Sequence, residues 1–420
     1  MNRHSTAAGI SVLATAIAFL GFCTAPAMAA TGDPPVLSDV SATYLSRVLA
    51  LAVARNDTPG VVALVVGRNG VLYEGAAGKL DPAGPMPVDA IFNIASMTKP
   101  VTSVAIMMLM ESGKLHLDDP VSKYLPGFDH LKVIKTFNAA DGSYETRPAV
   151  RAMTLRHLLT HTSGIGYAFS NPIVNRLQSG TQLREWDLPL LQDPGAQWNY
   201  SASTRVLGLI VEKVSGQTLE DFDQQHIFRP LGMVDTSYAV PAAKQSRLAA
   251  SYRHADGAFQ VQPGSAIPAT PTPPFGGDGG LYSTAGDYGR FMQMMLNGGH
   301  LGSARILNAH SVRLMGRNQI GAIFVEQQPA ANPALTRPFP LGAGRDKFGL
   351  GFQITAPDPD STRYRSPGSL SWAGIFNTEF WIDPQRHIGG VVMMQYLPFY
   401  DESALRTLRD FEAALYRQLP

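Results

Sequence analysis

The chain has 420 residues, of which 45% are hydrophobic and only 16% are charged. This composition excludes an intrinsically disordered chain and allows a large buried core, in one large or two interleaved domains. The formal net charge of +1 indicates neither a nucleic-acid partner nor an anionic membrane surface. The single cysteine, Cys23, excludes a disulfide scaffold and a cysteine-based metal site.

Residues 1–30 have the composition of a secretory signal peptide. A basic start precedes an apolar run over 7–22, and small residues lead to a cleavage site near Ala29. The apolar run of about sixteen residues is shorter than the roughly 20 that span a bilayer, which disfavours a stable membrane anchor. Phe22 fits poorly before Cys23 if that cysteine carried a lipid. We therefore expect cleavage and a mature protein that is secreted to the periplasm or the medium.

The first third of the chain predicts a helix, a β-hairpin and a second helix. Asn69-Gly70 between two β-rich runs is typical of a hairpin turn. The stretch 90–95 has a strand-like composition directly before the second helix. The predicted elements cover residues 38–56, 60–78 and 96–113.

The middle of the chain, about 118–250, carries mostly short helical patterns, with the clearest at 155–160 and 204–215. Two loops are expected over 262–280 and 325–345. The C-terminal part predicts a helix, three strands and a closing helix, over 283–297, 348–354, 376–382, 388–396 and 402–419.

The expected strands lie near both ends of the chain, while helices fill its middle. Because a lone hairpin is not stable, strands distant in sequence must pair in one sheet. We therefore expect an α/β (α+β) fold, in which residues 31–117 and 270–420 form a sandwich domain. A mainly helical domain, 118–269, is inserted between its two parts.

The tetrad Ser96-Met97-Thr98-Lys99 is the first candidate for chemistry. Residues three apart share a helix face, so the lysine amine lies near the serine hydroxyl. Serine needs a neighbour that takes its proton, and lysine does so when burial or nearby cations lower its pKa. A helix N-terminus also directs backbone N–H groups at a developing oxyanion. The tetrad alone is weakly specific, and the alternative is an N-cap serine beside an exposed lysine.

Two later stretches carry further candidates. Tyr200, within 197–203, follows a loop at a helix start, where its hydroxyl can exchange a proton; alternatively it packs in the core. The segment 371–375 places small residues at the entry to strand 376–382, where a substrate can approach the backbone closely. The alternative for this segment is a simple turn.

In this order, the Ser-x-x-Lys tetrad, the Tyr-Ser pair at 200–201 and Trp372-Ala373-Gly374 resemble the serine hydrolases related to class C β-lactamases and penicillin-binding proteins. The esterase branch, the family VIII-type carboxylesterases, is more similar still, because it carries Trp-x-Gly in place of Lys-Thr-Gly. The resemblance extends over about 40–400 and implies a β-lactamase/transpeptidase-like fold, with an antiparallel sheet flanked by the N- and C-terminal helices. Three further stretches support it, at 155–164, 228–233 and 276–284.

The resemblance also implies roles for single residues. Ser96 is the expected nucleophile, and Lys99 and Tyr200 share general-base and general-acid duty, with the acylation base left open. The backbone N–H groups of Ser96 and Ile375 are expected to form the oxyanion hole. The substrate pocket is expected to include the third motif: Trp372, Ala373 and Gly374.

Two departures from the family pattern favour an esterase. Ala202 stands where many members have an asparagine that contacts amide groups of lactams and peptides. Trp372 stands where a lysine binds the substrate carboxylate, and an aromatic wall suits an apolar ester better. Arg363 or Arg365 can still supply positive charge, which leaves lactam turnover open. We expect hydrolysis of short-chain carboxylic esters through an acyl-enzyme on Ser96.

Several alternatives remain at this stage. They are a β-lactamase or D-Ala-D-Ala carboxypeptidase, a transesterase or amide hydrolase, and a catalytically silent module that binds peptidoglycan. No metal or organic cofactor is implied: His157 and His161 have metal-ligand spacing, but they lie inside a family stretch that involves no metal. No serine has glycine at both −2 and +2, which removes the nucleophile elbow of the α/β-hydrolase fold. The expected partner is a small-molecule ester, with a β-lactam as the alternative.

Overall fold

The computed structural model describes Met1 and residues 36–262, 267–358 and 364–419. The predicted signal peptide, apart from Met1, lies outside these residues. Within them, no helix has both the length and the apolar character needed to cross a membrane.

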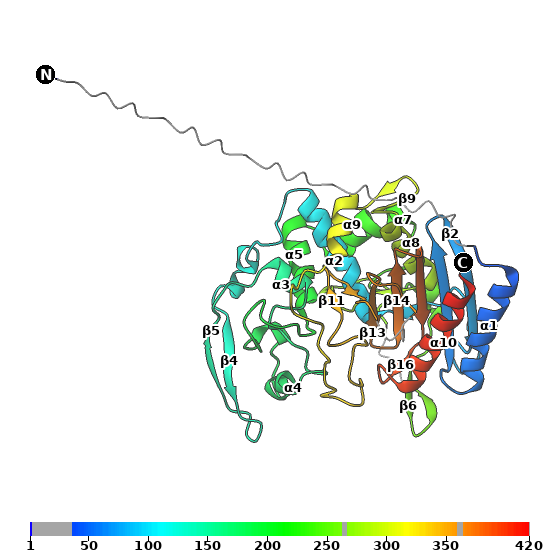
Figure 1. Cartoon of the computed structure of the whole chain (residues 1–420). Coiled ribbons are helices and arrows are strands. Elements are labelled where there is room, and N and C mark those ends of the chain that lie inside the picture. The colour runs from blue at the N-terminus through cyan, green and yellow to red at the C-terminus, as the bar shows by residue number, and fades with distance from the viewer. Residues whose placement is uncertain (2–35, 263–266, 359–363, 420) are drawn as a thin grey trace. The chain divides into compact units, whose positions relative to one another are not determined.

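A seven-stranded antiparallel sheet, in the order β11-β12-β13-β14-β15-β1-β2, lies at the centre of the fold (Figure 1). Strand β1 from the N-terminal part pairs with β15 from the C-terminal part, with Val62 opposite Met393. This pairing confirms that strands from the two ends of the chain build one sheet. The strands are β1 (Gly60–Gly67), β2 (Gly70–Gly78), β11 (Lys347–Phe348), β12 (Gln353–Ile354), β13 (Leu370–Gly374), β14 (Thr378–Asp383) and β15 (Ile388–Met393).

Different helices cover the two faces of the sheet. On one face α1 and α10 lie side by side and pack on Val61 and Val65 (Figure 1). On the other face α8 packs on the sheet, and Leu64 belongs to the larger core that also includes α2. Successive β1 side chains point to opposite faces, so a strand covered on both sides is apolar throughout. The helices are α1 (Asp39–Ala54), α2 (Thr98–Glu111), α8 (Ala285–Leu296) and α10 (Glu402–Gln418).

The C-terminal strands differ in detail from the prediction. The expected strand 348–354 is the two short strands β11 and β12, joined by a turn in which Gly351 has φ +91°. The residues expected to lead into strand 376–382 form a strand of their own, β13, and Asn377 with φ +63° turns the chain back into β14. The expected strand 388–396 ends at Met393, and β16 (Tyr396–Leu397) pairs with β6 in a separate sheet.

The middle of the chain contains two hairpins that the sequence did not predict. They are β4 (Lys132–Phe137) with β5 (Tyr144–Pro148), and β6 (Tyr252–Ala255) with β7 (Ala258–Val261). Most of their side chains are at least partly exposed, so no apolar alternation marks them. The predicted short helices are present as α3 (Leu155–Leu159) and α5 (Ser203–Ser215). The division of the chain into a sandwich and an inserted domain stays a prediction.

The remaining elements are short. They are β3 (Phe92–Asn93), α4 (Pro172–Gln178), α6 (Leu219–Asp223), α7 (Arg229–Leu231), β8 (Tyr282–Ser283), β9 (His300–Leu301), β10 (Ala304–Arg305) and α9 (Ala309–Met315).

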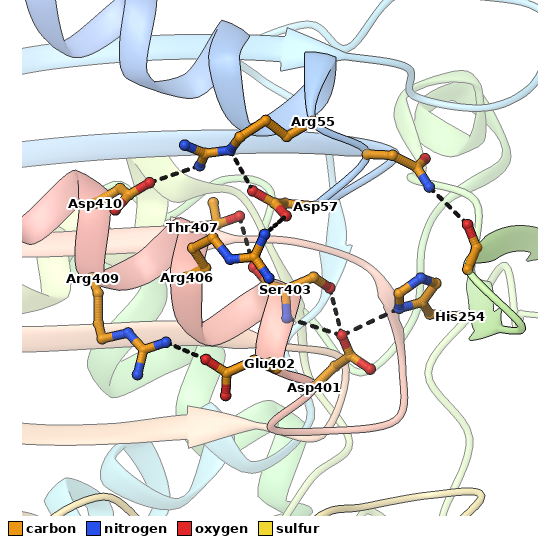
Figure 2. A network of polar contacts seen from close by, with 12 residues as sticks. Arg55, Asp57, His254, Asp401, Glu402, Ser403, Arg406, Thr407, Arg409 and Asp410 are labelled. Atoms are coloured by element: carbon orange, nitrogen blue, oxygen red, sulfur yellow. Dashed lines mark hydrogen bonds and ion pairs between the residues drawn. The ribbon is translucent and has the colours of Figure 1, made fainter.

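A network of charged side chains ties α1 to α10 (Figure 2). Asp57, three residues after α1, accepts hydrogen bonds from Arg55 Nε at 2.8 Å and from Arg406 Nη1 at 3.0 Å. Arg55 also pairs with Asp410 on α10, at 2.7 Å. The ion pairs therefore join the first and last described helices on the same face of the sheet.

Candidate active site

Ser96 lies in a 3₁₀ turn, Ala95–Met97, that links β3 to α2. Ala95 has φ +43°, in the left-handed region that residues other than glycine rarely adopt. Its backbone N–H donates to Asn93 Oδ1 at 3.0 Å, and the neighbouring N–H of Ile94 donates to the carbonyl of Leu281 at 3.1 Å. These contacts hold the strained turn, so that Ser96 is fixed just before the N-terminus of α2.

Lys99 is buried directly beside this serine. Its Nζ donates to Ser96 Oγ at 2.9 Å and to the backbone carbonyl of Asp278 at 2.6 Å. Burial lowers the pKa of Lys99 to about 7, the negative charge of Asp278 opposes this shift, and the positive charge of Arg205 adds to it. A large fraction of Lys99 is therefore neutral near pH 7 and able to accept a proton. The alternative of an exposed lysine beside a capping serine does not fit this geometry.

Tyr200 lies over the same pair of side chains. Its hydroxyl accepts a bond from Trp372 Nε1 at 3.4 Å, and Ser96 is near enough to lower the pKa of Tyr200. Its ring centroid is 4.8 Å from Lys99 Nζ, and its backbone N–H donates to Gln328 Oε1 at 3.2 Å. Burial raises the pKa of Tyr200 well above its ordinary value, although Ser96 and Trp372 lower it. Tyr200 is therefore a protonated phenol near pH 7, suited to donate a proton.

The end of β13 approaches the serine turn very closely. A Cβ on Gly374 would lie 2.4 Å from the carbonyl oxygen of Ile94, so only glycine permits this approach. The packing brings Ile375 to the cavity that Ser96 also lines. Neither the Ser96 nor the Ile375 backbone N–H donates a hydrogen bond to another of the described residues. Both donors are available for an oxyanion, and the oxyanion hole that the resemblance implies stays a prediction.

The structure places the Trp372-Ala373-Gly374 motif only partly in the substrate pocket. Ala373 and Trp372 line the cavity, but Gly374 does not, because it packs against the serine turn. Trp372 is 6% exposed and is held in a group of aromatic rings with centroid distances of 5.0 to 6.3 Å. It forms a fixed wall that also orients the Tyr200 hydroxyl. The rings around it are those of His161, Trp198, Tyr200 and Phe348.

Asp278 is a site residue that the sequence analysis did not single out. Its carboxylate is buried, accepts a hydrogen bond from Arg205 Nε at 2.7 Å, and accepts a second one from the Tyr167 hydroxyl. Burial raises its pKa, but the charges of Lys99 and Arg205 outweigh this and hold the pKa below its ordinary value. The sequence signal that could have identified Asp278 is its position between two pairs of glycines, at 276–280. Glycines on both sides allow the backbone carbonyl of Asp278 to come within hydrogen-bonding distance of Lys99.

The histidines with metal-ligand spacing have structural partners. His157 Nδ1 accepts a bond from the Thr154 backbone N–H at 3.1 Å in a capping box that begins α3. His161 Nδ1 hydrogen-bonds with Ser201 Oγ at 3.0 Å, and burial lowers the pKa of His161 well below its ordinary value. The described ranges contain no group of three histidine, cysteine or acidic side chains arranged to hold a metal ion.

Comparison with known proteins identifies the family of the chain. The pattern of the family described as "Beta-lactamase" matches residues 45–415. Esterase EstB of Burkholderia gladioli is 32% identical over 396 residues, which cover 84% of this chain and 91% of EstB. The monacolin J acid methylbutanoyltransferase of Aspergillus terreus is 31% identical over 352 residues, which cover 80% of this chain and 84% of the relative.

Solved structures show the same fold. A mutant of simvastatin synthase (LovD) from Aspergillus terreus superposes with a TM-score of 0.75 and 28% identity, over 90% of this chain and 95% of the other. The fold is therefore the β-lactamase/transpeptidase-like α/β fold that the motifs predicted. The chain belongs to the β-lactamase family of serine hydrolases and acyltransferases, in its esterase branch.

Proposed function

We propose that this chain hydrolyses short-chain carboxylic esters through an acyl-enzyme on Ser96. The observation that carries the proposal is the buried contact of 2.9 Å between Lys99 Nζ and Ser96 Oγ, with a lysine pKa of about 7. A lysine with this pKa is a good general base near neutral pH, whereas Tyr200 keeps its proton. We therefore assign proton abstraction from Ser96 to Lys99.

The acylation step follows from these assignments. Lys99 takes the proton of Ser96 as Oγ forms a bond to the ester carbonyl carbon, and the backbone N–H groups of Ser96 and Ile375 stabilise the oxyanion. The intermediate then collapses as the bond to the leaving alcohol breaks. Tyr200 gives its proton to that oxygen and regains one from Lys99. Water attacks the acyl-enzyme in the same manner, which restores Ser96 and releases the acid.

The cavity lining supports an ester as substrate. Beside Ser96 it presents the apolar side chains of Phe169, Phe339, Ile375 and Phe399. Apolar walls beside Ser96 and a few placed polar groups suit an ester group. The relative named Esterase EstB supports the same substrate class. Arg365, which the sequence left open as a carboxylate-binding residue, is paired with Glu412, and this weakens the case for a β-lactam or a D-Ala-D-Ala substrate.

A second candidate is acyl transfer to an alcohol. The relative named as a methylbutanoyltransferase is 31% identical over most of both chains. The acyl-enzyme would be the same, and only the nucleophile that releases the acyl group would differ. An amide hydrolase or a silent peptidoglycan-binding module has no comparable observation in its favour.

We further propose that the protein is secreted after cleavage near Ala29 and Ala30, on the basis of the predicted signal peptide. N-terminal sequencing of the protein recovered from the native host tests this. A first residue near Ala30 or Thr31 supports the proposal, and an intact Met1 on the exported protein contradicts it.

Parallel assays with p-nitrophenyl butyrate and a chromogenic cephalosporin test the proposed function, with Ser96→Ala as the control. We expect fast ester turnover, little cephalosporin turnover, and a loss of about 10³-fold or more in Ser96→Ala. Adding a primary alcohol and measuring the butyrate ester formed separates transfer from hydrolysis. Faster cephalosporin turnover would contradict the esterase assignment. Failure of a fluorophosphonate to label Ser96 would instead favour the binding module.

A further inference from the structure

The cavity beside Ser96 extends to residues that the mechanism does not use. Its lining includes Ala373 on β13, Glu379 on β14 and Glu412 on α10, besides Ser96 and Tyr200. Glu379 stands opposite Ala373 in the pairing of β13 with β14, so both side chains point to the same sheet face. The cavity therefore reaches from the serine turn to the sheet face that α10 covers.

Glu379 is a buried residue whose carboxylate has no hydrogen-bonding partner. The residue is only 7% exposed, and no hydrogen bond or ion pair joins its carboxylate to any other described residue, although Arg365 is near enough to lower its pKa. Burial of a carboxylate without a compensating donor is unfavourable, so such a group either takes up a proton or is matched by a water molecule, an ion or a ligand. Because Glu379 lines the cavity, a molecule bound there can supply the missing partner.

The charges around Glu379 do not balance. Arg365 pairs with Glu412 through Nε, at 2.8 Å, and through a second guanidinium nitrogen, and its guanidinium carbon lies 4.8 Å from the centroid of Trp381. Arg365 is thereby committed to Glu412, and Arg409, which also lines the cavity, pairs with Glu402. Neither arginine forms an ion pair with Glu379, so one negative charge remains to be neutralised when Glu379 is ionised.

Aromatic rings complete this part of the cavity. Phe339, Phe399 and Tyr400 line it together with Glu379, and the ring centroids of Phe399 and Tyr400 are 4.4 Å apart. Aromatic faces attract cations, above all quaternary ammonium groups that cannot form strong hydrogen bonds. A carboxylate beside several aromatic rings is a chemically sound receptor for such a group.

We infer that this part of the pocket binds a cationic group on the substrate, an alkylammonium or quaternary ammonium, with Glu379 as its counter-ion. The inference deepens the proposed function and rests on it, since it names the substrate class of the same site. The cation can belong to the acyl group or to the alcohol group of the ester. Glu379 is thus a specificity-determining residue that takes no part in proton transfer at Ser96.

The protonation of Glu379 gives the inference a pH signature. Burial raises its pKa to about 8, Arg365 lowers it and Glu412 raises it further. Tyr400, which also faces this region, stays protonated because burial raises its pKa. Only the ionised carboxylate can counter a cation, so the preference for cationic esters rises as the pH rises through about 8. Dividing kcat/KM for the cationic ester by kcat/KM for the neutral ester removes the effect of Lys99 titration, which both esters share.

Pairs of isosteric esters provide the test. For a cation on the acyl group, p-nitrophenyl 4-(trimethylammonio)butanoate is compared with p-nitrophenyl 5,5-dimethylhexanoate. For a cation on the alcohol group, the ester butyrylcholine is compared with 3,3-dimethylbutyl butyrate. We expect kcat/KM to favour the cationic member of one pair by about 10-fold, with a ratio that increases between pH 7 and 9. A ratio at or below one in both pairs, or a ratio that falls with pH, would overturn the inference.

The variant Glu379→Gln removes the charge and keeps the shape. We expect it to abolish the preference and its pH dependence, with the neutral ester of each pair measured on the same variant as the reference. Glu145→Gln on β5, whose side chain is 66% exposed, is the matched control and should keep the wild-type ratio. A preference that survives Glu379→Gln would contradict the role of Glu379. The wild-type ratio decides the question even if this variant does not fold.

The inference and the proposed function fail in different ways. Turnover of the neutral esters without cationic preference overturns the inference alone. If no ester reacts and Ser96 is not labelled, the proposed function fails, and calorimetry with hexyltrimethylammonium on the wild-type protein then decides the cation site. Binding that Glu379→Gln abolishes would support the site, and absence of binding would overturn it.

Discussion

Two charged regions of this protein differ in their exposure to water. In the network between α1 and α10, Asp57 pairs with Arg55 and Arg406, whose side chains are 41% and 48% exposed (Figure 2). Beside Ser96, Lys99 and the carboxylate of Asp278 are almost fully buried. Water screens the arginines of the first set, although Asp57 itself is only 3% exposed, whereas in the second set each charge strongly affects the protonation of its neighbours.

This difference in exposure separates charges that join two helices from charges that prepare Ser96 for reaction. The exposed arginines tie two helices together through Asp57 and Asp410. Burial of Lys99 brings its pKa to about 7, which makes the amine a base for Ser96. Similar ionic groups therefore serve the stability of the fold in one region and the proposed chemistry in the other.

Replacing the buried Lys99 should have the largest effect of the changes in either region. Lys99→Met keeps the length of the side chain but removes the base, so we expect kcat/KM for p-nitrophenyl butyrate to fall by about 10²–10⁴-fold. Lys114→Met, at an exposed position just after α2, is the control and should retain activity. A rate for Lys99→Met within a few-fold of wild type would show that another group takes the proton of Ser96.

Removing the charge of Asp278 should change the pH profile as well as the rate. Asp278 raises the pKa of Lys99, so Asp278→Asn should lower that pKa further. Because Lys99 acts in its neutral form, the rise of kcat/KM with pH then begins at lower pH than in the wild type, and we expect a loss of about 10-fold at the plateau from the weaker base.

The control for this shift is Asp193→Asn. Asp193 is also paired with an arginine, Arg147, but does not line the cavity. We expect its profile to match that of the wild type. A shift to higher pH in Asp278→Asn would contradict the proposed coupling between Asp278 and Lys99.

The sequence predicted those parts of the site that depend on local spacing or on a motif. Ser96 and Lys99 are three residues apart at a helix start, so their contact follows from helix geometry. Tyr200 was a candidate from its place after a loop at a helix start, and its role came from the resemblance to the family. The contact of Lys99 with Asp278 joins residues 179 positions apart, and no local pattern encodes it.

The sequence pattern also did not identify Glu379, because its strand is buried on both faces. All six residues of β14 are buried, so neither alternation nor exposure marks Glu379 in the sequence. The one available signal was an acid within the apolar run of the predicted strand 376–382. The division of the sheet between the chain ends was predictable from strand composition, whereas the turn that separates β13 from β14 depends on the left-handed conformation of Asn377.

The smallest effect is expected in the network between α1 and α10, and it concerns stability alone. Asp57→Asn replaces two charge-assisted hydrogen bonds with weaker ones, so we expect the free energy of unfolding to fall by about 1–2 kcal/mol. Glu145→Gln, which breaks the exposed pair with Lys135, should change it by less than about 0.5 kcal/mol. Urea denaturation measures both, and kcat/KM for p-nitrophenyl butyrate should equal that of the wild type in each variant. A loss of activity in Asp57→Asn without a loss of stability would mean that the network between α1 and α10 also positions the reactive groups, and the separation between attachment and reactivity would no longer hold.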